Sequence, residues 1–202
     1  PLAELERAWR RVDIRKGPVV EIEQNWSRGV LGGAVWLASI ALARYVASKN
    51  FEGLAVLGAG AGGLPSIAAA RAGAVSVTAT DGDAAVLPLL ERNLDRNAPQ
   101  QAAARLLRWG DELAVGDPDL ILAADAVYGG TRDAWAPFLE TCRRAPRVLF
   151  AHTHRYQNDD TAFFALATAM RFDVAELSRG AELSRGAEED VVLTDDATTT
   201  TL

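Results

Sequence analysis

Residues 54–81 read LAVLGAGAGGLPSIAAARAGAVSVTATD, and this segment carries the clearest signal of the fold class. Its first four residues form a short apolar run, which the glycine-rich segment GAGAGG at 58–63 interrupts. Glycine lets a backbone turn sharply and approach a ligand closely. A helix is then expected, with Pro65 in its first turn and Gly73 at its end. The β-branched residues of 75–80 predict a second strand, so the stretch indicates a strand–helix–strand unit.

Asp81 ends the second strand, roughly 20 residues after the glycines, where a ribose-binding carboxylate stands in nucleotide-binding folds. The unit therefore predicts a nucleoside cofactor. Its glycines fit two patterns. Gly58, Gly60 and Gly63 match the dinucleotide fingerprint GxGxxG, whereas Gly58, Gly60 and Gly62 match the GxGxG turn of S-adenosylmethionine enzymes. The glycines alone leave both cofactors open.

Composition indicates a globular protein of one domain, residues 1–202. Hydrophobic residues make up 49% of the chain and charged residues 24%. The net charge of −6 argues against a nucleic-acid partner. The single cysteine, Cys142, excludes an internal disulfide. No apolar run reaches the ~20 residues of a membrane span and no signal peptide is recognised, so we expect a cytoplasmic or nuclear location without membrane contact.

The rest of the chain alternates predicted strands and helices. Strands are expected at 19–24, 54–57, 75–80, 104–107, 118–123 and 147–152, with 172–177 and 190–193 as a final antiparallel hairpin. Helices are expected at 35–48, 66–71, 83–97, 133–144 and 159–170. The first 17 residues suit a short amphipathic helix or a frayed arm.

This alternation predicts an α/β fold: a three-layer α/β/α sandwich around a Rossmann-like, seven-stranded, mostly parallel sheet with a C-terminal antiparallel hairpin. Residues 1–34 would form an N-terminal strand/helix extension, 35–194 the core, and 195–202 a loose tail. Ligands of open parallel sheets bind beyond the carboxyl ends of the strands. The glycine turn, Asp81, Trp109 and the segment ADAVY all follow strand ends, so we expect them on one rim.

At the level of its motifs the chain resembles the seven-strand, Rossmann-like (class I) methyltransferases that modify lysines of non-histone proteins, such as chaperones and translation elongation factors. The resemblance spans nearly the whole chain, from about residue 19 to 193. The segments that carry it, in order, are IEQNW, VWLASIALARY, LGAGAGGLPSIAAARAGA, VTATD, RWG and DLILAADAVY. It implies an S-adenosylmethionine-dependent protein-lysine N-methyltransferase whose partner is a protein substrate presenting a lysine.

The resemblance also implies roles for individual residues. Those expected at the cofactor are Trp36, the glycine turn of Gly58, Ala59, Gly60 and Gly62, the ribose acceptor Asp81, and Trp109 and Ala124 beside the adenine. Asp125 and Tyr128 match an Asp-x-x-Tyr element beside the lysine channel and are the catalytic candidates. A dry pocket near Tyr128 would favour the uncharged amine, and Asp125 could orient it. The plainer alternatives are a helix N-cap for Asp125, a rim aromatic for Tyr128 and a core aromatic for Trp36.

Two further observations bear on function. The family usually carries Glu or Asp at the position of Val56, where a carboxylate would help to hold the cationic end of the cofactor. Its absence motivates one alternative, a non-catalytic binding protein on a methyltransferase fold; the GxGxxG match motivates another, an NAD(P)-linked oxidoreductase. His152 and His154 form a potential metal pair, but the sequence shows no third ligand, so no metal is expected.

Overall fold

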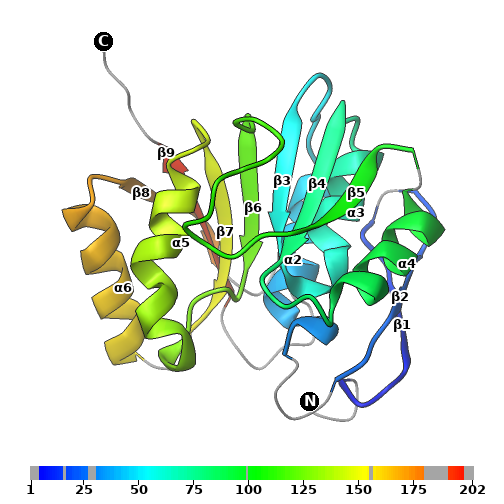
Figure 1. The fold of residues 1–202 in the computed structure, drawn as a ribbon, viewed down its shortest axis with the longest axis horizontal. Helices are drawn as coiled ribbons and strands as arrows, with labels where there is room; N and C mark the ends of the chain where they lie inside the picture. The colour runs from blue at the N-terminus through cyan, green and yellow to red at the C-terminus, as the bar shows by residue number, and fades with distance from the viewer. Residues whose placement is uncertain are drawn as a thin grey trace.

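The computed structural model describes residues 5–15, 17–26, 31–98, 100–154, 157–179 and 191–197. A seven-stranded sheet with the order β5-β4-β3-β6-β7-β9-β8 runs through the molecule (Figure 1). Its parallel strands are β3 (Ala55–Ala59), β4 (Ser76–Asp81), β5 (Ala102–Leu106), β6 (Leu120–Ala124) and β7 (Val148–Thr153). At the far edge, β9 (Val191–Ala197) pairs antiparallel with β7, and β8 (Asp173–Arg179) pairs antiparallel with β9.

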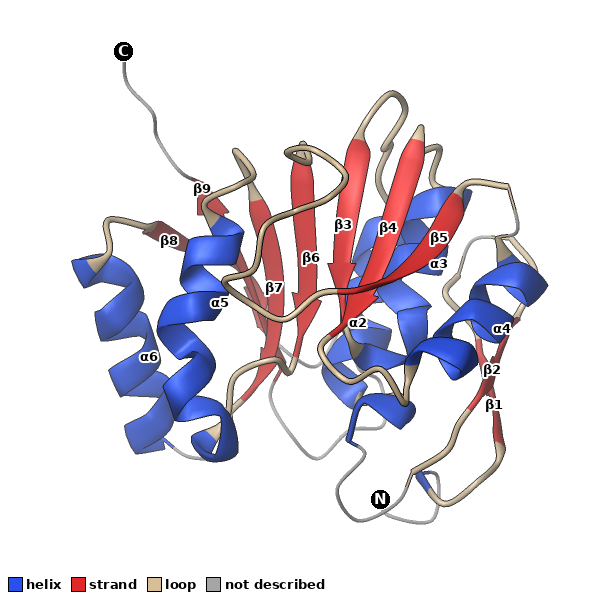
Figure 2. Cartoon of the chain, in the orientation of Figure 1, coloured by secondary structure: helices blue, strands red, loops and turns tan. Residues whose placement is uncertain are grey.

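Helices cover both faces of the sheet, which confirms the predicted α/β/α layering (Figure 2). On one face lie α2 (Leu37–Ala47), α3 (Leu64–Arg71) and α4 (Leu87–Asn97). On the other lie α5 (Trp135–Cys142) and α6 (Gln157–Ala169). Because side chains alternate along a strand, Val56 faces the first layer and Leu57 the second. The two strands at the centre of the sheet, β3 and β6, are apolar throughout, as parallel strands buried on both faces require.

Part of the N-terminal segment that we expected to be a short helix or an arm is a strand, while residues 1–4 lie outside the described residues. Trp9–Val12 forms β1, which pairs antiparallel with β2 (Val20–Glu23) in a separate two-stranded sheet. Val12 and Ile14 are both buried and stand two residues apart, the period of an extended chain rather than of a helix. The predicted strand at 19–24 is confirmed as β2.

Two asparagines of α4 attach β2 to the core. Asn93 accepts a hydrogen bond from the Glu23 amide (2.8 Å) and donates to the Glu23 carbonyl (3.0 Å). Asn97 pairs in the same way with the backbone of Glu21, at 3.3 and 2.9 Å. Since the two amides stand one helical turn apart, they meet alternate residues of the strand. Asn93 is 1% exposed, so its amide is a buried link between α4 and β2.

The C-terminal strand is longer than expected. β9 continues to Ala197, so residues 195–197 pair with the sheet instead of belonging to a loose tail. The hexapeptide AELSRG occurs twice in succession, and residues 175–179 of its first copy belong to β8. The second copy, at 181–186, lies outside the described residues.

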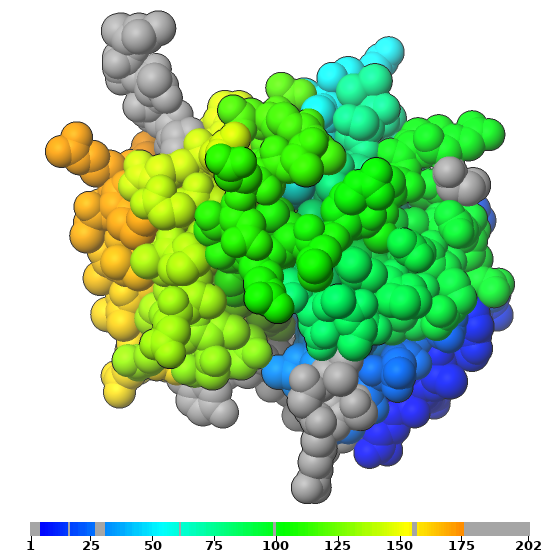
Figure 3. Space-filling view, viewed as in Figure 1, coloured from blue at the N-terminus to red at the C-terminus, as the bar shows by residue number. Residues whose placement is uncertain are grey.

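Two loop features shape the rim. The helix expected from residue 83 begins at Leu87, because the Asp83 carboxylate accepts the Ala85 amide (2.9 Å) and forms a turn instead. The segment between β5 and β6, residues 107–119, crosses the front of the sheet, as the green chain in Figures 1 and 3 shows. Within the described residues, no helix is long and apolar enough to cross a bilayer.

Candidate active site

A cavity of about 610 Å³ opens at the carboxyl ends of β3, β4 and β6. Most of the residues that the sequence singled out line it. Those are Trp36, Ala59, Gly60, Asp81, Trp109, Ala124, Asp125 and Tyr128. The expectation that strand ends would gather these residues on one rim is therefore met.

Gly58 and Gly62 lie outside the lining of this cavity, and packing explains both. A Cβ on Gly58 would stand 1.9 Å from the Ser66 hydroxyl oxygen, so Gly58 allows α3 to pack against β3. Gly62 has a φ of +66°, and a Cβ there would meet Ile22 of β2 at 3.5 Å. These glycines shape the turn, while Ala59 and Gly60 face the cavity.

Asp81 presents a partly buried carboxylate at the end of β4. One oxygen accepts the Asp83 amide at 2.9 Å, and the other lies 2.6 Å from where a Cβ on Gly32 would stand. Gly32 is thus a site residue that was not predicted from the sequence. The pair Gly32-Gly33 shortly before the apolar helix α2 could have indicated a close approach of the backbone there. Burial raises the pKa of Asp81 above its ordinary value, and the hydrogen bond from Asp83 offsets this in part.

Two indole rings line the same cavity. Trp36 directly precedes α2 and donates from its ring nitrogen to the Leu31 carbonyl at 3.1 Å. Trp109 packs edge-on against Phe138 with ring centroids 4.9 Å apart. Both rings are partly exposed, so Trp36 is not simply a core aromatic. Aromatic walls, an accepting carboxylate and the open backbone at Gly60 fit a nucleoside with ribose hydroxyls.

Asp125 is held firmly in place. Its two carboxylate oxygens accept the Thr153 amide (2.8 Å) and the Thr153 hydroxyl (2.9 Å). The residue adopts a φ of +48°, which is rare for a side chain other than glycine. These bonds tie the end of β6 to the end of β7. The helix N-cap alternative does not hold, because the carboxylate bonds to a neighbouring strand.

Tyr128 lines the cavity from the segment between β6 and α5. Its ring lies so close to Gly130 that a Cβ there would be 2.8 Å from a ring carbon. The Thr131 hydroxyl oxygen accepts the Tyr128 amide at 3.0 Å. Gly130 and Thr131 therefore fix the position of Tyr128, and a side chain at position 130 would collide with its ring.

Several other lining residues were not singled out from the sequence. They are Leu31, Gly32, Thr80, Gly82, Asp83, Leu107, Arg108, Ala126, Thr131, Asp133, Ala134 and Pro137. Most of them are neighbours in sequence of a residue that was singled out. Their position next to a strand end could therefore have indicated that they line the cavity. Asp133 and Pro137 line the cavity because α5 and the turn before it pack over the rim. This packing cannot be predicted from the local sequence.

We expected no metal at His152 and His154 because the sequence shows no third ligand, but the structure places a third potential ligand beside them. His152 of β7 and His154, just after it, both bond to Asp160 of α6 at 2.6 Å. Asp160 is the third potential ligand that the sequence did not reveal. Burial raises its pKa, but the hydrogen bonds from the two histidines outweigh this and leave the pKa below its ordinary value.

This fold and rim define a class of protein, the Rossmann-like methyltransferases. Similar solved structures include magnesium protoporphyrin IX methyltransferase from Synechocystis PCC 6803 with bound S-adenosylmethionine (TM-score 0.60, 20% identity, 78% of this chain and 77% of that one). A putative S-adenosylmethionine-dependent methyltransferase from Streptococcus mutans is also similar (TM-score 0.63, 12% identity, 94% of this chain and 56% of that one). At these identities the likeness establishes the fold.

Within that class the chain belongs to the lysine methyltransferase family, whose model matches residues 14–170. It is also similar to the protein-lysine N-methyltransferase EFM6 of Saccharomyces cerevisiae, at 28% identity over 80% of this chain and 78% of that protein. The resemblance drawn from the motifs is thereby confirmed. The family uses S-adenosylmethionine as its methyl donor, so the oxidoreductase alternative is set aside.

Proposed function

We propose that this protein binds S-adenosylmethionine in the rim cavity and methylates a lysine side chain of a non-histone protein, such as a chaperone or an elongation factor. One observation carries the proposal. Asp81 and the Asp125–Tyr128 segment line one cavity, so a nucleoside-binding carboxylate and the Asp-x-x-Tyr element share a single space.

The cofactor end of the cavity is built from β3 and β4. Asp81 would accept both ribose hydroxyls through its carboxylate. Trp36 and Trp109 would enclose the nucleoside, with Ala124 beside its base. Ala59 and Gly60 would run beneath the methionine part, and Gly58 and Gly62 would support that turn from behind.

The lysine end lies at Asp125 and Tyr128. When bound, S-adenosylmethionine supplies a methyl group on a sulfonium, and the protein must align an uncharged amine with it. Lysine has a reference pKa of about 10.4, so a low-polarity wall at Tyr128 would help to release its proton. Asp125 has both oxygens bonded to Thr153, so we assign it the positioning of the rim and an acceptor contact to the amine.

The test is methyl transfer from labelled S-adenosylmethionine to proteins of a cell lysate, followed by mass spectrometry of methylated lysines. Tyr128→Phe should lower transfer while leaving cofactor affinity nearly unchanged, because the ring stays but its hydroxyl is lost. Tyr45→Phe serves as the matched control and should leave transfer unchanged, because Tyr45 lies near the C-terminal end of α2 and does not line the cavity. Cofactor binding without any labelled protein would instead support the non-catalytic alternative.

A further inference from the structure

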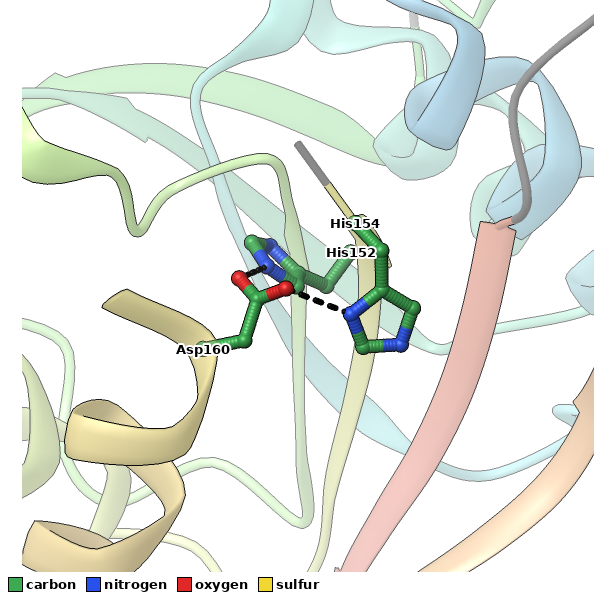
Figure 4. A group of neighbouring side chains, drawn as sticks. All are labelled: His152, His154 and Asp160. Atoms are coloured by element: carbon green, nitrogen blue, oxygen red, sulfur yellow. Dashed lines mark hydrogen bonds and ion pairs between the residues drawn. The ribbon is translucent and has the colours of Figure 1, made fainter. Parts of the chain in front are cut away.

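A second cluster of ionisable side chains lies where the end of β7 meets α6. His152 Nε2 and His154 Nδ1 each lie 2.6 Å from a different oxygen of the Asp160 carboxylate. Figure 4 shows that carboxylate between the two imidazole rings. The three candidate ligand atoms all lie within 4.8 Å of one another. The cluster thus brings two imidazoles and one carboxylate to a single point.

Hydrogen bonding within the cluster leaves one buried atom unexplained. His152 is 5% exposed, and among the described residues its Nδ1 has no hydrogen-bond partner. If Nε2 donates to Asp160, a neutral ring leaves Nδ1 as a bare acceptor in a buried place. The Asp125 carboxylate oxygen Oδ1 lies 4.0 Å from this nitrogen and can only accept a hydrogen bond. A cation on Nε2 would resolve this, because Nδ1 would then carry the proton and face that carboxylate.

We propose that His152, His154 and Asp160 bind one divalent transition-metal ion of the zinc type. Imidazole and carboxylate ligands suit zinc, and three protein ligands leave a fourth position for water. Ligand atoms on one zinc ion stand roughly 3–3.5 Å apart, given bond lengths of about 2.0–2.2 Å. A small withdrawal of Asp160 from between the rings would open that space. Half-exposed His154 places the site next to solvent.

The surroundings match the second shell of a metal site. Histidines that bind metals usually donate their other ring N–H to a carboxylate, which fixes the ring orientation. Asp125 stands at that position for His152, and a small rotation would close the 4.0 Å gap. Thr153, between the two histidines, already holds Asp125. A bound ion would therefore join α6 to β7 and stiffen the strand end that positions Asp125.

The experiment uses the full chain, freed of metal with a chelator and titrated with Zn²⁺ near neutral pH by calorimetry. We expect one ion per chain, and Co²⁺ in its place should give the visible absorption of a four-coordinate site. His154→Gln keeps a donor towards Asp160 but removes the imidazole ligand, and Asp160→Asn removes the charge. Each should weaken Zn²⁺ binding by more than about 100-fold, beyond the usual effect of a second-shell change.

The controls separate this site from others. His152 and His154 are the only histidines of the sequence, and Cys142 is its only cysteine. Asp159→Asn changes the neighbouring carboxylate, which bonds to Arg132 instead, and should leave Zn²⁺ affinity unchanged. No Zn²⁺ binding by the folded parent would overturn the proposal and leave the two histidines as hydrogen-bond partners of Asp160 only. Binding that survives both ligand variants would overturn it too. None of these readouts depends on methyl transfer.

Discussion

Asp81 is the side chain on which cofactor binding should depend most. If it accepts both ribose hydroxyls, Asp81→Ala should cost about 1.5–3 kcal/mol of binding free energy, the range for hydrogen bonds to a charged group. That corresponds to a loss of about 10–100-fold in S-adenosylmethionine affinity, measurable by calorimetry. The far-ultraviolet circular dichroism should not change. An unaltered affinity in the folded variant would contradict the assignment.

Asp81 should also make cofactor affinity depend on pH. Burial raises its pKa, so it takes up a proton at a higher pH than an ordinary aspartate. The charged form is the stronger acceptor, and affinity should therefore fall as pH falls through that raised pKa, by up to about ten-fold per pH unit. Asp81→Asn should remove this dependence. A slope that persists in Asp81→Asn would place the titrating group elsewhere.

Val56 leads to a different expectation now that its surroundings are known. From the family pattern, Val56→Glu would strengthen cofactor binding by adding a carboxylate. Val56 is 2% exposed and packs in the core shared with α2 and α3, away from the cavity lining. We therefore expect Val56→Glu to lower the free energy of unfolding by about 3 kcal/mol, because it buries an unpaired charge.

A matched control for Val56 exists in Val75, which is 66% exposed. Val75→Glu introduces the same charge at the surface and should change stability by less than about 0.5 kcal/mol. Urea denaturation of both variants makes the comparison. Equal stabilities would show that position 56 accommodates a carboxylate, as the family pattern suggests.

At the scale of elements, α4 holds the N-terminal sheet through side-chain amides. Asn93→Ala removes three hydrogen bonds, to the Glu23 amide and carbonyl and to the Gly62 carbonyl. A buried backbone group left without its partner costs about 1–3 kcal/mol. Only the bond to the Gly62 carbonyl is fully buried, so we expect a total loss of at least about that size. Amide hydrogen exchange should quicken in β2 before it quickens in β4.

Asp95→Ala is the control on the same helix, since Asp95 is exposed. It should leave stability within about 0.5 kcal/mol of the parent. Exchange that quickens equally in β2 and β4 after Asn93→Ala would mean that the helix supports the whole sheet and not β2 in particular.

At the scale of the whole molecule, ligand binding should stabilise the fold by mass action. S-adenosylmethionine at 100 times its Kd should add about 2.7 kcal/mol to the free energy of unfolding. For a chain of this size that is a rise of about 5–10 °C in Tm. NADH at the same concentration should produce no rise. Thermal unfolding followed by fluorescence tests this, and a shift with NADH alone would reopen the oxidoreductase alternative.

Much of the fold could be predicted because its signals are local. A buried parallel strand is an unbroken apolar run, and a turn with positive φ favours glycine, so β3, the glycine turn and β4 followed from residues 54–81. The rim position of Asp81, Trp109 and Asp125 followed as well, since parallel strands end on one side of a sheet.

Contacts between distant segments decided the rest. The sequence pattern around Asn93 predicts a helix. That its side-chain amide bonds to the backbone of Glu23 follows only from the packing of α4 beside β2. Gly58 looks like a ligand-binding glycine until Ser66 of α3 is placed against it. Asp160 joins His152 because α6 returns to the end of β7. Most strands and helices, and the residues at the rim, could be predicted from the sequence because backbone preference and burial act locally. Tertiary structure decided which side chains meet, because that depends on how the layers pack.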